Sequence, residues 1–369
     1  MMNSEFKKTP FYEKHISLGA QMAPFGGYMM PISYKGILQE HHACRNGAVL
    51  FDTCHMGEFT FKGGHVIQDL ETLVSCDVSS MNIGQCRYGL MCNENGGTID
   101  DLLVYRTGET EFMLVVNAGT QDNDFAWIKS HLSADTVALN ISDKTAKFDL
   151  QGPLSAKIIR KIADEPIADM KFYHFKPNKS GGKNIIVSRT GYTGEIGFEV
   201  YSDPELSLKL WNRCMELGAE PAGLGARDTL RLEMGMPLYG HELSEKLNAG
   251  QSGFDRAISL SKKFIGSKVV LDGAQRKSAL AGIRLEGRRA ARNGDIILDE
   301  AGNTIGEVTS GSFAPSLEIA IAMGYVNRSF SSPGSRILIK TTRQNIPGVV
   351  CELPFYRKAT ARKPLKDFL

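Results

Sequence analysis

The chain has 369 residues, of which 42% are hydrophobic and 23% charged, and its formal net charge is +2. This length predicts two or three domains, and the near-neutral charge gives no reason to expect a nucleic acid or an anionic membrane as a partner. We expect no secretory signal, because the segment Met1–His15 is polar, and no membrane span, because no apolar run is long enough.

The cysteines and histidines do not form a metal-binding pattern. The seven cysteines are an odd number with no Cys-x-x-Cys pair, which indicates reduced, cytosolic thiols rather than a disulfide framework. His41 and His42 are adjacent, which is not the spacing of a zinc site. We interpret the isolated His55 as a packed or hydrogen-bonded residue, and we predict no metal site.

In chain order, the first fifty residues read as irregular, with Pro24 and Pro31 as breakers. A first cycle of elements follows, with a helix over 66–73, another from about Thr120, and strands over 58–61, 87–91, 99–105 and 112–116. The last of these strands is continuously apolar, as a strand buried on both faces should be.

A second cycle repeats the pattern. Strands are predicted over 147–150 and 185–188, with one helix opened by Gly152-Pro153 and running through Ile162 and another capped by Asp203. Two such cycles indicate two α+β units that share a face.

Beyond about Ser278 the pattern changes to short strands between glycine-rich turns, at 280–285, 295–298, 319–323 and 337–340. These are typical of a small antiparallel barrel or sandwich. The basic tail, which holds Arg357, Arg362 and Lys366, reads as a solvated terminus.

The segment Gly191–Val200, GYTGEIGFEV, is the most informative motif. Its glycines predict a turn in which backbone approaches a ligand. In the strand that follows, Phe198 and Val200 would enter the core, while Glu199 shares the opposite face with Gly197. This arrangement predicts a flat slot for a ligand, with the Glu199 carboxylate at its edge as a hydrogen-bond acceptor. An ordinary hairpin with solvated glutamates has the same pattern.

Three further positions carry polar groups at the ends of predicted elements. Asp100 and Asp101 follow a Gly-Gly turn, and at most one of them should face a shared pocket because neighbouring strand residues point oppositely. Asn117 ends the most apolar strand, where its amide can donate and accept. Arg227, near a helix start, could bind a carboxylate, while Asp228 and Arg231 could be a local surface pair.

Together these segments resemble the glycine cleavage system T-protein family of aminomethyltransferases. The matching stretches run in order over nearly the whole chain: 51–58, 96–102, 115–118, 191–200, 223–233 and 306–315. The resemblance implies an α+β clover-leaf of three domains, two related α+β domains and a C-terminal antiparallel β-barrel. The boundaries we assign are 1–50 with 140–275 for the first domain, 51–139 for the second and 276–369 for the barrel.

The resemblance also implies an activity and its residues. The family transfers an aminomethyl group from a lipoylated H-protein to tetrahydrofolate, a co-substrate, and releases ammonia and 5,10-methylenetetrahydrofolate. Asp101 matches the catalytic aspartate. The positions that match folate-lining residues are Tyr88, Asn117, Tyr192, Glu199, Arg227 and, as a looser match in the tail, Arg362. A cytoplasmic, bacterial monomer is the corresponding expectation.

Two positions depart from the family pattern: Cys54 stands where a serine is usual, and Ala291-Arg292 replaces a common Pro-Arg. Two alternatives stay open within the fold. One is a folate-dependent demethylase that acts on another methyl donor. The other is a non-catalytic folate-binding protein of iron–sulfur assembly, whose relatives carry a Lys-Gly-Cys-Tyr motif, whereas this chain has Arg189-Thr190-Gly191-Tyr192.

Overall fold

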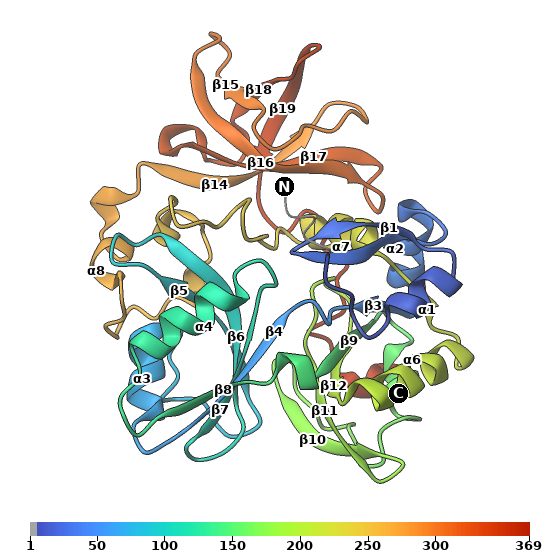
Figure 1. The fold of residues 1–369 in the computed structure, drawn as a ribbon. Coiled ribbons are helices and arrows are strands. Elements are labelled where there is room, and N and C mark those ends of the chain that lie inside the picture. The colour runs from blue at the N-terminus through green and yellow to red at the C-terminus, as the bar shows by residue number, and fades with distance from the viewer. Residues whose placement is uncertain (1–5) are drawn as a thin grey trace.

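Three lobes meet around a common centre in the computed structural model, which describes residues 6–369 (Figure 1). Two α+β lobes lie side by side, and a β-barrel lies above them in this view. Residues 1–5, which belong to the first predicted domain and to the segment Met1–His15, lie outside the described residues.

The first lobe is built on a six-stranded sheet in the order β10-β11-β12-β9-β3-β13, antiparallel except for the pair of β13 and β3. The strands are β3 (Val49–Asp52), β9 (Ala146–Gln151), β10 (Phe175–Ser180), β11 (Lys183–Ser188), β12 (Gly197–Ser202) and β13 (Glu220–Pro221). Its helices are α1 (Tyr12–Ser17), α2 (Ile37–Asn46), α5 (Ser155–Ile159), α6 (Pro204–Glu216) and α7 (Leu224–Glu233). A hairpin of β1 (Gln21–Phe25) and β2 (Tyr28–Ser33) completes it.

Helix α6 illustrates how local sequence sets an element of this lobe. The Asp203 carboxylate accepts a 2.9 Å hydrogen bond from the backbone N–H of Leu206, and Pro204 occupies the first turn, where its missing N–H costs nothing. Leu210 and Trp211 then pack onto the sheet beside Phe198 in the main core of the lobe. The predicted cap is confirmed.

The second lobe carries a five-stranded sheet in the order β5-β6-β7-β4-β8. Its strands are β4 (Gly57–Lys62), β5 (Cys86–Cys92), β6 (Thr98–Arg106), β7 (Glu111–Val116) and β8 (Val137–Asn140), with helices α3 (Val66–Leu73) and α4 (Gln121–Ser130). Residues 113–116 of β7 are buried throughout, as its apolar run predicts. Leu90 and Cys92 of β5 also pack against a later segment that includes Leu243, Phe264 and the short helix α8 (Ser267–Val270).

The two α+β lobes share a packed interface, which confirms the predicted common face. Cys86, Tyr105 and Val115 from the second sheet cluster with Phe175 and Tyr201 from the first. This interface later positions the ionisable groups of the site.

The third lobe is a closed barrel of six strands in the order β14-β17-β16-β15-β18-β19, in which β19 pairs back onto β14. The strands are β14 (Ser278–Leu285), β15 (Ile296–Leu298), β16 (Thr304–Ala314), β17 (Ile319–Asn327), β18 (Arg336–Lys340) and β19 (Asn345–Cys351). Ile283, Ile297 and Val308 are fully buried inside it. The three-lobed α+β architecture with a barrel is therefore confirmed, while the exact domain boundaries stay a prediction.

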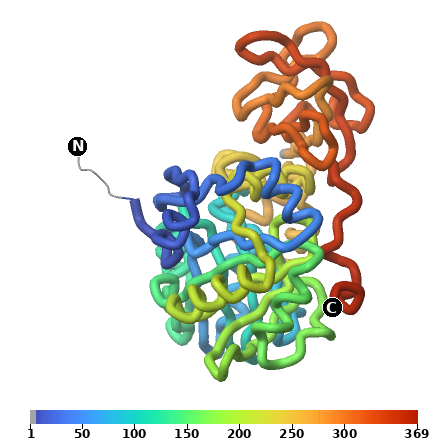
Figure 2. Tube along the Cα trace, turned by 90° about the vertical axis from the view of Figure 1, so that its right-hand side faces the viewer, coloured from blue at the N-terminus to red at the C-terminus, as the bar shows by residue number. Residues whose placement is uncertain are grey.

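The C-terminal segment leaves the barrel and returns to the first lobe (Figure 2). Leu365, in a 3-10 turn over Leu365–Phe368, is buried in the core of that lobe. Arg189 donates to the carbonyls of Ala361 (3.0 Å) and Lys363 (2.5 Å). The interpretation of the tail as a solvated terminus is correct for its basic side chains, since Arg357, Arg362 and Lys366 are exposed, but it is wrong for the backbone, which Leu365 and Arg189 fix to the first lobe.

Two other sequence expectations need correction. Residues 12–46 are not irregular, since they form α1, the β1–β2 hairpin and α2, and Pro24 and Pro31 lie inside the strands of that hairpin. Helix α5 ends at Ile159 rather than Ile162, and it begins at Ser155. Within residues 6–369, no helix has the length and apolar run that crossing a bilayer requires.

Candidate active site

Asp101 lies at the centre of a hydrogen-bonded chain across three strands of the second lobe. Tyr88 on β5 donates a 3.0 Å bond from its hydroxyl to Oδ2 of Asp101 on β6. Asn117, which follows β7, donates from Nδ2 to Oδ1 of Asp101 (2.9 Å) and to Oδ1 of Asp100 (2.8 Å). The backbone N–H of Asn117 also donates to Asp100 (2.9 Å). The predicted residues Tyr88, Asp101 and Asn117 are therefore in direct contact.

Burial and a second carboxylate control the ionisation of Asp101. Burial raises the pKa of Asp101 to about 7, the charge of Asp100 adds to the effect, and the hydrogen bonds from Tyr88 and Asn117 oppose it. An aspartate with this pKa can exchange a proton near neutral pH, which an ordinary surface aspartate cannot.

Asp124 on α4 is a member of this group that the sequence analysis missed. Its carboxylate is fully buried and accepts no hydrogen bond from the described residues. Burial and the neighbouring Asp100 raise the pKa of Asp124 to about 10, so this side chain is a neutral acid at pH 7. Only its proximity to Asp100 in the folded chain reveals it, because an aspartate in the sequence DNDF reads as a solvated helix residue.

Glu199 on β12 lies at the interface between the lobes. Its Oε2 accepts from Thr190 (2.8 Å), Tyr201 (3.0 Å) and Tyr105 (3.1 Å), the last of which comes from the second lobe. Its Oε1 lies 3.4 Å from Nζ of the buried Lys147. Although burial opposes ionisation, the Lys147 ammonium and these hydroxyls hold the pKa of Glu199 below its usual range.

Arg227 on α7 is already paired inside the protein. Its Nη1 lies 2.7 Å from Oδ2 of the buried Asp149, and its guanidinium lies 4.9 Å from the ring centroid of Tyr192. The Tyr192 hydroxyl donates to the carbonyl of Pro237. The predicted residues Arg227 and Tyr192 thus contact each other. Asp228 and Arg231 do pair (2.8 Å), but Arg231 is buried and also binds Glu242 (3.0 Å), so they are not a surface pair.

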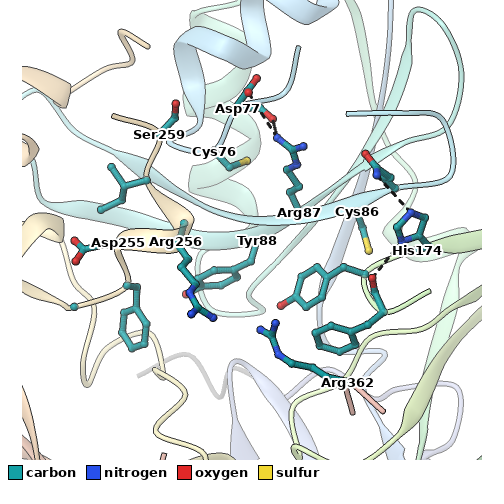
Figure 3. A pocket seen from close by; sticks show the side chains of 17 residues that line it. Cys76, Asp77, Cys86, Arg87, Tyr88, His174, Asp255, Arg256, Ser259 and Arg362 are labelled. Carbon is teal, nitrogen blue, oxygen red and sulfur yellow. Dashed lines mark hydrogen bonds and ion pairs between the residues drawn. The ribbon is translucent and has the colours of Figure 1, made fainter. Parts of the chain in front are cut away.

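A cavity of about 860 Å³ opens where the two α+β lobes, the loop 253–259 and the C-terminal tail meet (Figure 3). Of the predicted residues, Tyr88 and Arg362 line it. The guanidinium groups of Arg256 and Arg362 point toward the same space. Neither has a carboxylate within ion-pair distance among residues 6–369, although Asp77 and Asp255 also line the cavity. The lining of the cavity therefore carries two guanidinium groups that no carboxylate of the described residues neutralises.

Tyr173 is a residue of the cavity wall that sequence reasoning missed. It lines the cavity, and burial raises the pKa of its hydroxyl, with the negative charges of Glu199 and Asp101 adding to the effect. Its backbone has φ of +59°, a left-handed conformation that is unusual for a tyrosine and common at functional sites. The adjacent bridge between Gln85 and His174, which joins the lobes, cannot be read from the sequence.

The glycines of the segment Gly191–Val200 have a different structural role from the one predicted. Phe198 and Val200 are fully buried in the core, as expected. A Cβ on Gly191 or Gly197, however, would overlap the side-chain amide of Gln151, which donates to the carbonyl of Thr190 (3.1 Å). The space over Gly191 and Gly197 is therefore filled by the side chain of Gln151, so these two glycines do not form the predicted flat slot.

His55 is packed as predicted. It is buried, its ring lies edge-on to Phe25 at 5.5 Å between centroids, and burial lowers its pKa to about 3. The neighbouring Cys54 lies against Lys147, where its Sγ approaches the backbone carbonyl at 3.2 Å.

Comparison with known proteins covers both parts of the chain. Residues 11–262 match the GCVT N-terminal domain, and residues 279–357 match the glycine cleavage T-protein C-terminal barrel domain. An aminomethyltransferase of Halothermothrix orenii is 41% identical over 358 residues, which span 95% of this chain and 99% of the relative. One of Bacteroides fragilis is 40% identical over 360 residues, with 95% and 99% covered.

A solved structure agrees with the fold as well as with the sequence. The crystal structure of glycine cleavage system aminomethyltransferase T from Bartonella henselae superposes with a TM-score of 0.91 at 31% identity, covering 97% of this chain and all of that chain. The chain therefore belongs to the glycine cleavage T-protein family of aminomethyltransferases.

Proposed function

We propose that this chain is the tetrahydrofolate-dependent aminomethyltransferase of the glycine cleavage system. Its substrates are the aminomethyl-lipoyl form of the H-protein and tetrahydrofolate, and its products are ammonia, 5,10-methylenetetrahydrofolate and the dihydrolipoyl H-protein. The observation that carries the proposal is the hydrogen-bonded chain of Tyr88, Asp101 and Asn117 beside a large cavity at the junction of the lobes.

The cavity fits a reduced folate by size and chemistry. About 860 Å³ lies within the range of about 300–1,000 Å³ typical of small-molecule sites. Tyr88, Phe172 and Tyr173 give it aromatic walls, and Arg256 and Arg362 give its lining positive charge. A flat heterocycle with an anionic tail matches this combination.

The other matched residues have roles of the same kind. Glu199 and Asn117 would bind the polar edge of the folate ring, and Tyr192 would contact it through aromatic surface. Arg227 neutralises Asp149 and stacks on Tyr192, so its contribution is to hold that ring, while Arg362 meets the anionic tail. Bound tetrahydrofolate supplies the two nitrogens that take up the one-carbon unit, one in the reduced ring and one in the linker between the ring and its anionic tail.

Asp101 is the residue we assign to catalysis. Its carboxylate orients the folate nitrogen and stabilises the positive charge that develops as the carbon–sulfur bond breaks and ammonia leaves. The hydroxyl of Tyr88 and the amide of Asn117 fix both oxygens of this carboxylate, so little reorganisation is needed during the reaction.

The remaining parts of the proposal concern assembly and location. The protein acts as a cytoplasmic, bacterial monomer that meets the lipoylated H-protein transiently and needs no nucleic acid. The domain boundaries 1–50 with 140–275, 51–139 and 276–369 belong to the same proposal. All seven cysteines are free, which suits a reducing compartment.

The test is to mix the purified protein with tetrahydrofolate and aminomethylated lipoyl carrier and to measure ammonia release. The proposal predicts release that needs both substrates. A protein that releases no ammonia but demethylates another methyl donor would instead be the folate-dependent demethylase. Folate binding without any transfer would favour the non-catalytic alternative.

A further inference from the structure

Lys147 is a buried lysine whose one ion pair within residues 6–369 is with Glu199. Its side chain is 1% exposed, although it lies on β9 at the interface between two lobes. Its Nζ lies 3.4 Å from Oε1 of Glu199 and 3.2 Å from Sδ of Met56, and 5.7 Å from the ring centroid of Tyr201. An ammonium ion removed from water is costly, so a lysine in this position must be held by its interaction with Glu199.

The two carboxylate oxygens of Glu199 have different kinds of partner. Oε2 accepts the three hydroxyl bonds described above, whereas Oε1 faces Lys147. Among the described residues, Lys147 alone places a cation within 4 Å of this carboxylate, since Arg227 is paired with Asp149. The titratable or charged groups that face Glu199 are Lys147, Asp149, Arg227, Glu58, Tyr105, Tyr173, Tyr201 and Cys86.

We propose that Lys147 is a positioning residue that keeps the Glu199 carboxylate ionised, so that it presents only acceptors to the ring of the bound folate. This inference rests on the proposed function, in which Glu199 binds the polar edge of that ring. The edge carries neighbouring N–H donors, and a protonated Glu199 would oppose one of them with a donor of its own.

Glu58 shows what the same environment does to a carboxyl group without such a partner. It lies on β4, is 1% exposed, and its Oε1 accepts no hydrogen bond from the described residues. Burial raises the pKa of Glu58 to about 8, with Lys147 lowering it only in part and Glu199 raising it further. Glu199 is as deeply buried, yet its pKa lies below the usual range because Lys147 and the hydroxyls act on it directly.

The test measures tetrahydrofolate binding by anaerobic calorimetry between pH 5.5 and 9, which needs no turnover. For the wild-type protein, Glu199 stays ionised and its contribution to the Kd is independent of pH. For Lys147→Met, which keeps the volume and removes the charge, burial raises the pKa of Glu199. We expect the Kd to rise at least ~10-fold at pH 6 and to recover as the pH approaches 9.

Two variants control for structural damage. Glu58→Gln replaces a neutral acid by a neutral amide on β4 of the second lobe, and it should leave the Kd and its pH dependence at pH 6–7 as in the wild type. Lys147→Arg restores the charge and should restore tight binding at pH 6. A Lys147→Met protein that binds with the wild-type Kd, or loses affinity equally at every pH, overturns the proposal.

If Lys147→Met alone does not fold, a comparison of the double variant Lys147→Met/Glu199→Gln with the single variant Glu199→Gln still tests the proposal. Lys147→Met/Glu199→Gln removes both charges and should bind folate as Glu199→Gln does, with no new pH dependence. An additional loss of affinity in the double variant contradicts the proposal. If the wild-type protein itself does not bind tetrahydrofolate, it is the proposed function that fails, so the two failures are distinguishable.

Discussion

The hydroxyl of Tyr88 donates a 3.0 Å hydrogen bond to Oδ2 of Asp101, which joins the cavity wall to this half-buried carboxylate. Because burial raises the pKa of Asp101 to about 7, the ionised form that we assign to catalysis is only partly populated at neutral pH. We therefore expect kcat for ammonia release to rise as pH increases from 6 to 8. A kcat that stays constant over this range would show that the ionisation of Asp101 does not limit the rate.

Tyr88→Phe removes a hydrogen bond that favours the ionised form of Asp101, so the pKa of Asp101 should rise further. We expect the acidic limb of the kcat profile to move up by roughly 0.5–1 pH unit. Tyr12→Phe, on α1 in the first lobe, is the matched control, because the Tyr12 hydroxyl makes no hydrogen bond within residues 6–369. Equal profiles for the two variants would contradict the assignment.

Glu58 gives a prediction about stability rather than activity. Burial raises the pKa of Glu58 to about 8, above its unfolded value, so its stabilising contribution is present below about pH 4.5 and is lost as the pH rises toward 8. Glu58→Gln does not titrate. We expect its advantage over the wild type in the free energy of unfolding to grow by roughly 3 kcal/mol between pH 5.5 and pH 8.5 in urea titrations. Glu286 is exposed, so the free energy of unfolding of Glu286→Gln should depend on pH as that of the wild type does. If Glu58→Gln also showed the wild-type pH dependence, Glu58 would be ionised in the folded protein throughout this range.

The C-terminal tail offers a test of its docking. Leu365 is 3% exposed in the core of the first lobe, whereas the adjacent Lys366 is exposed. Leu365→Ala should lower the free energy of unfolding by about 2–4 kcal/mol, and Lys366→Ala should leave it unchanged. Since the tail also carries Arg362 to the cavity, we expect Leu365→Ala to weaken tetrahydrofolate binding as well. Two variants of equal stability would mean that the tail is not packed in solution.

Elements set by neighbouring residues could be predicted from the sequence. The cap of α6 depends on Asp203 and Pro204, which are adjacent, and the burial of β7 depends on an unbroken apolar run. The same local logic placed Phe198 in the core. The Tyr88, Asp101 and Asn117 contacts followed from the family resemblance, because strand pairing brings together residues that periodicity alone cannot align.

Features that depend on distant contacts could not be predicted. The side chain of Gln151 fills the space beside Gly191 and Gly197, and no sequence pattern around Gln151 predicts this contact. Tyr173 reaches the cavity only because the two lobes join beside it. The sequence of the tail indicates a solvated terminus because it is rich in charged residues. Leu365 is nevertheless buried, because it packs into the core of the first lobe, far from it in sequence.

The central claim is that the Asp101 carboxylate carries out catalysis in a folate-binding cavity. The most direct measurement compares tetrahydrofolate-dependent ammonia release from aminomethylated lipoyl carrier by the wild type and Asp101→Asn, with folate Kd determined on the same preparations. We predict that Asp101→Asn binds folate within roughly tenfold of the wild type but loses at least ~100-fold in turnover. Near-normal turnover by Asp101→Asn would contradict the account.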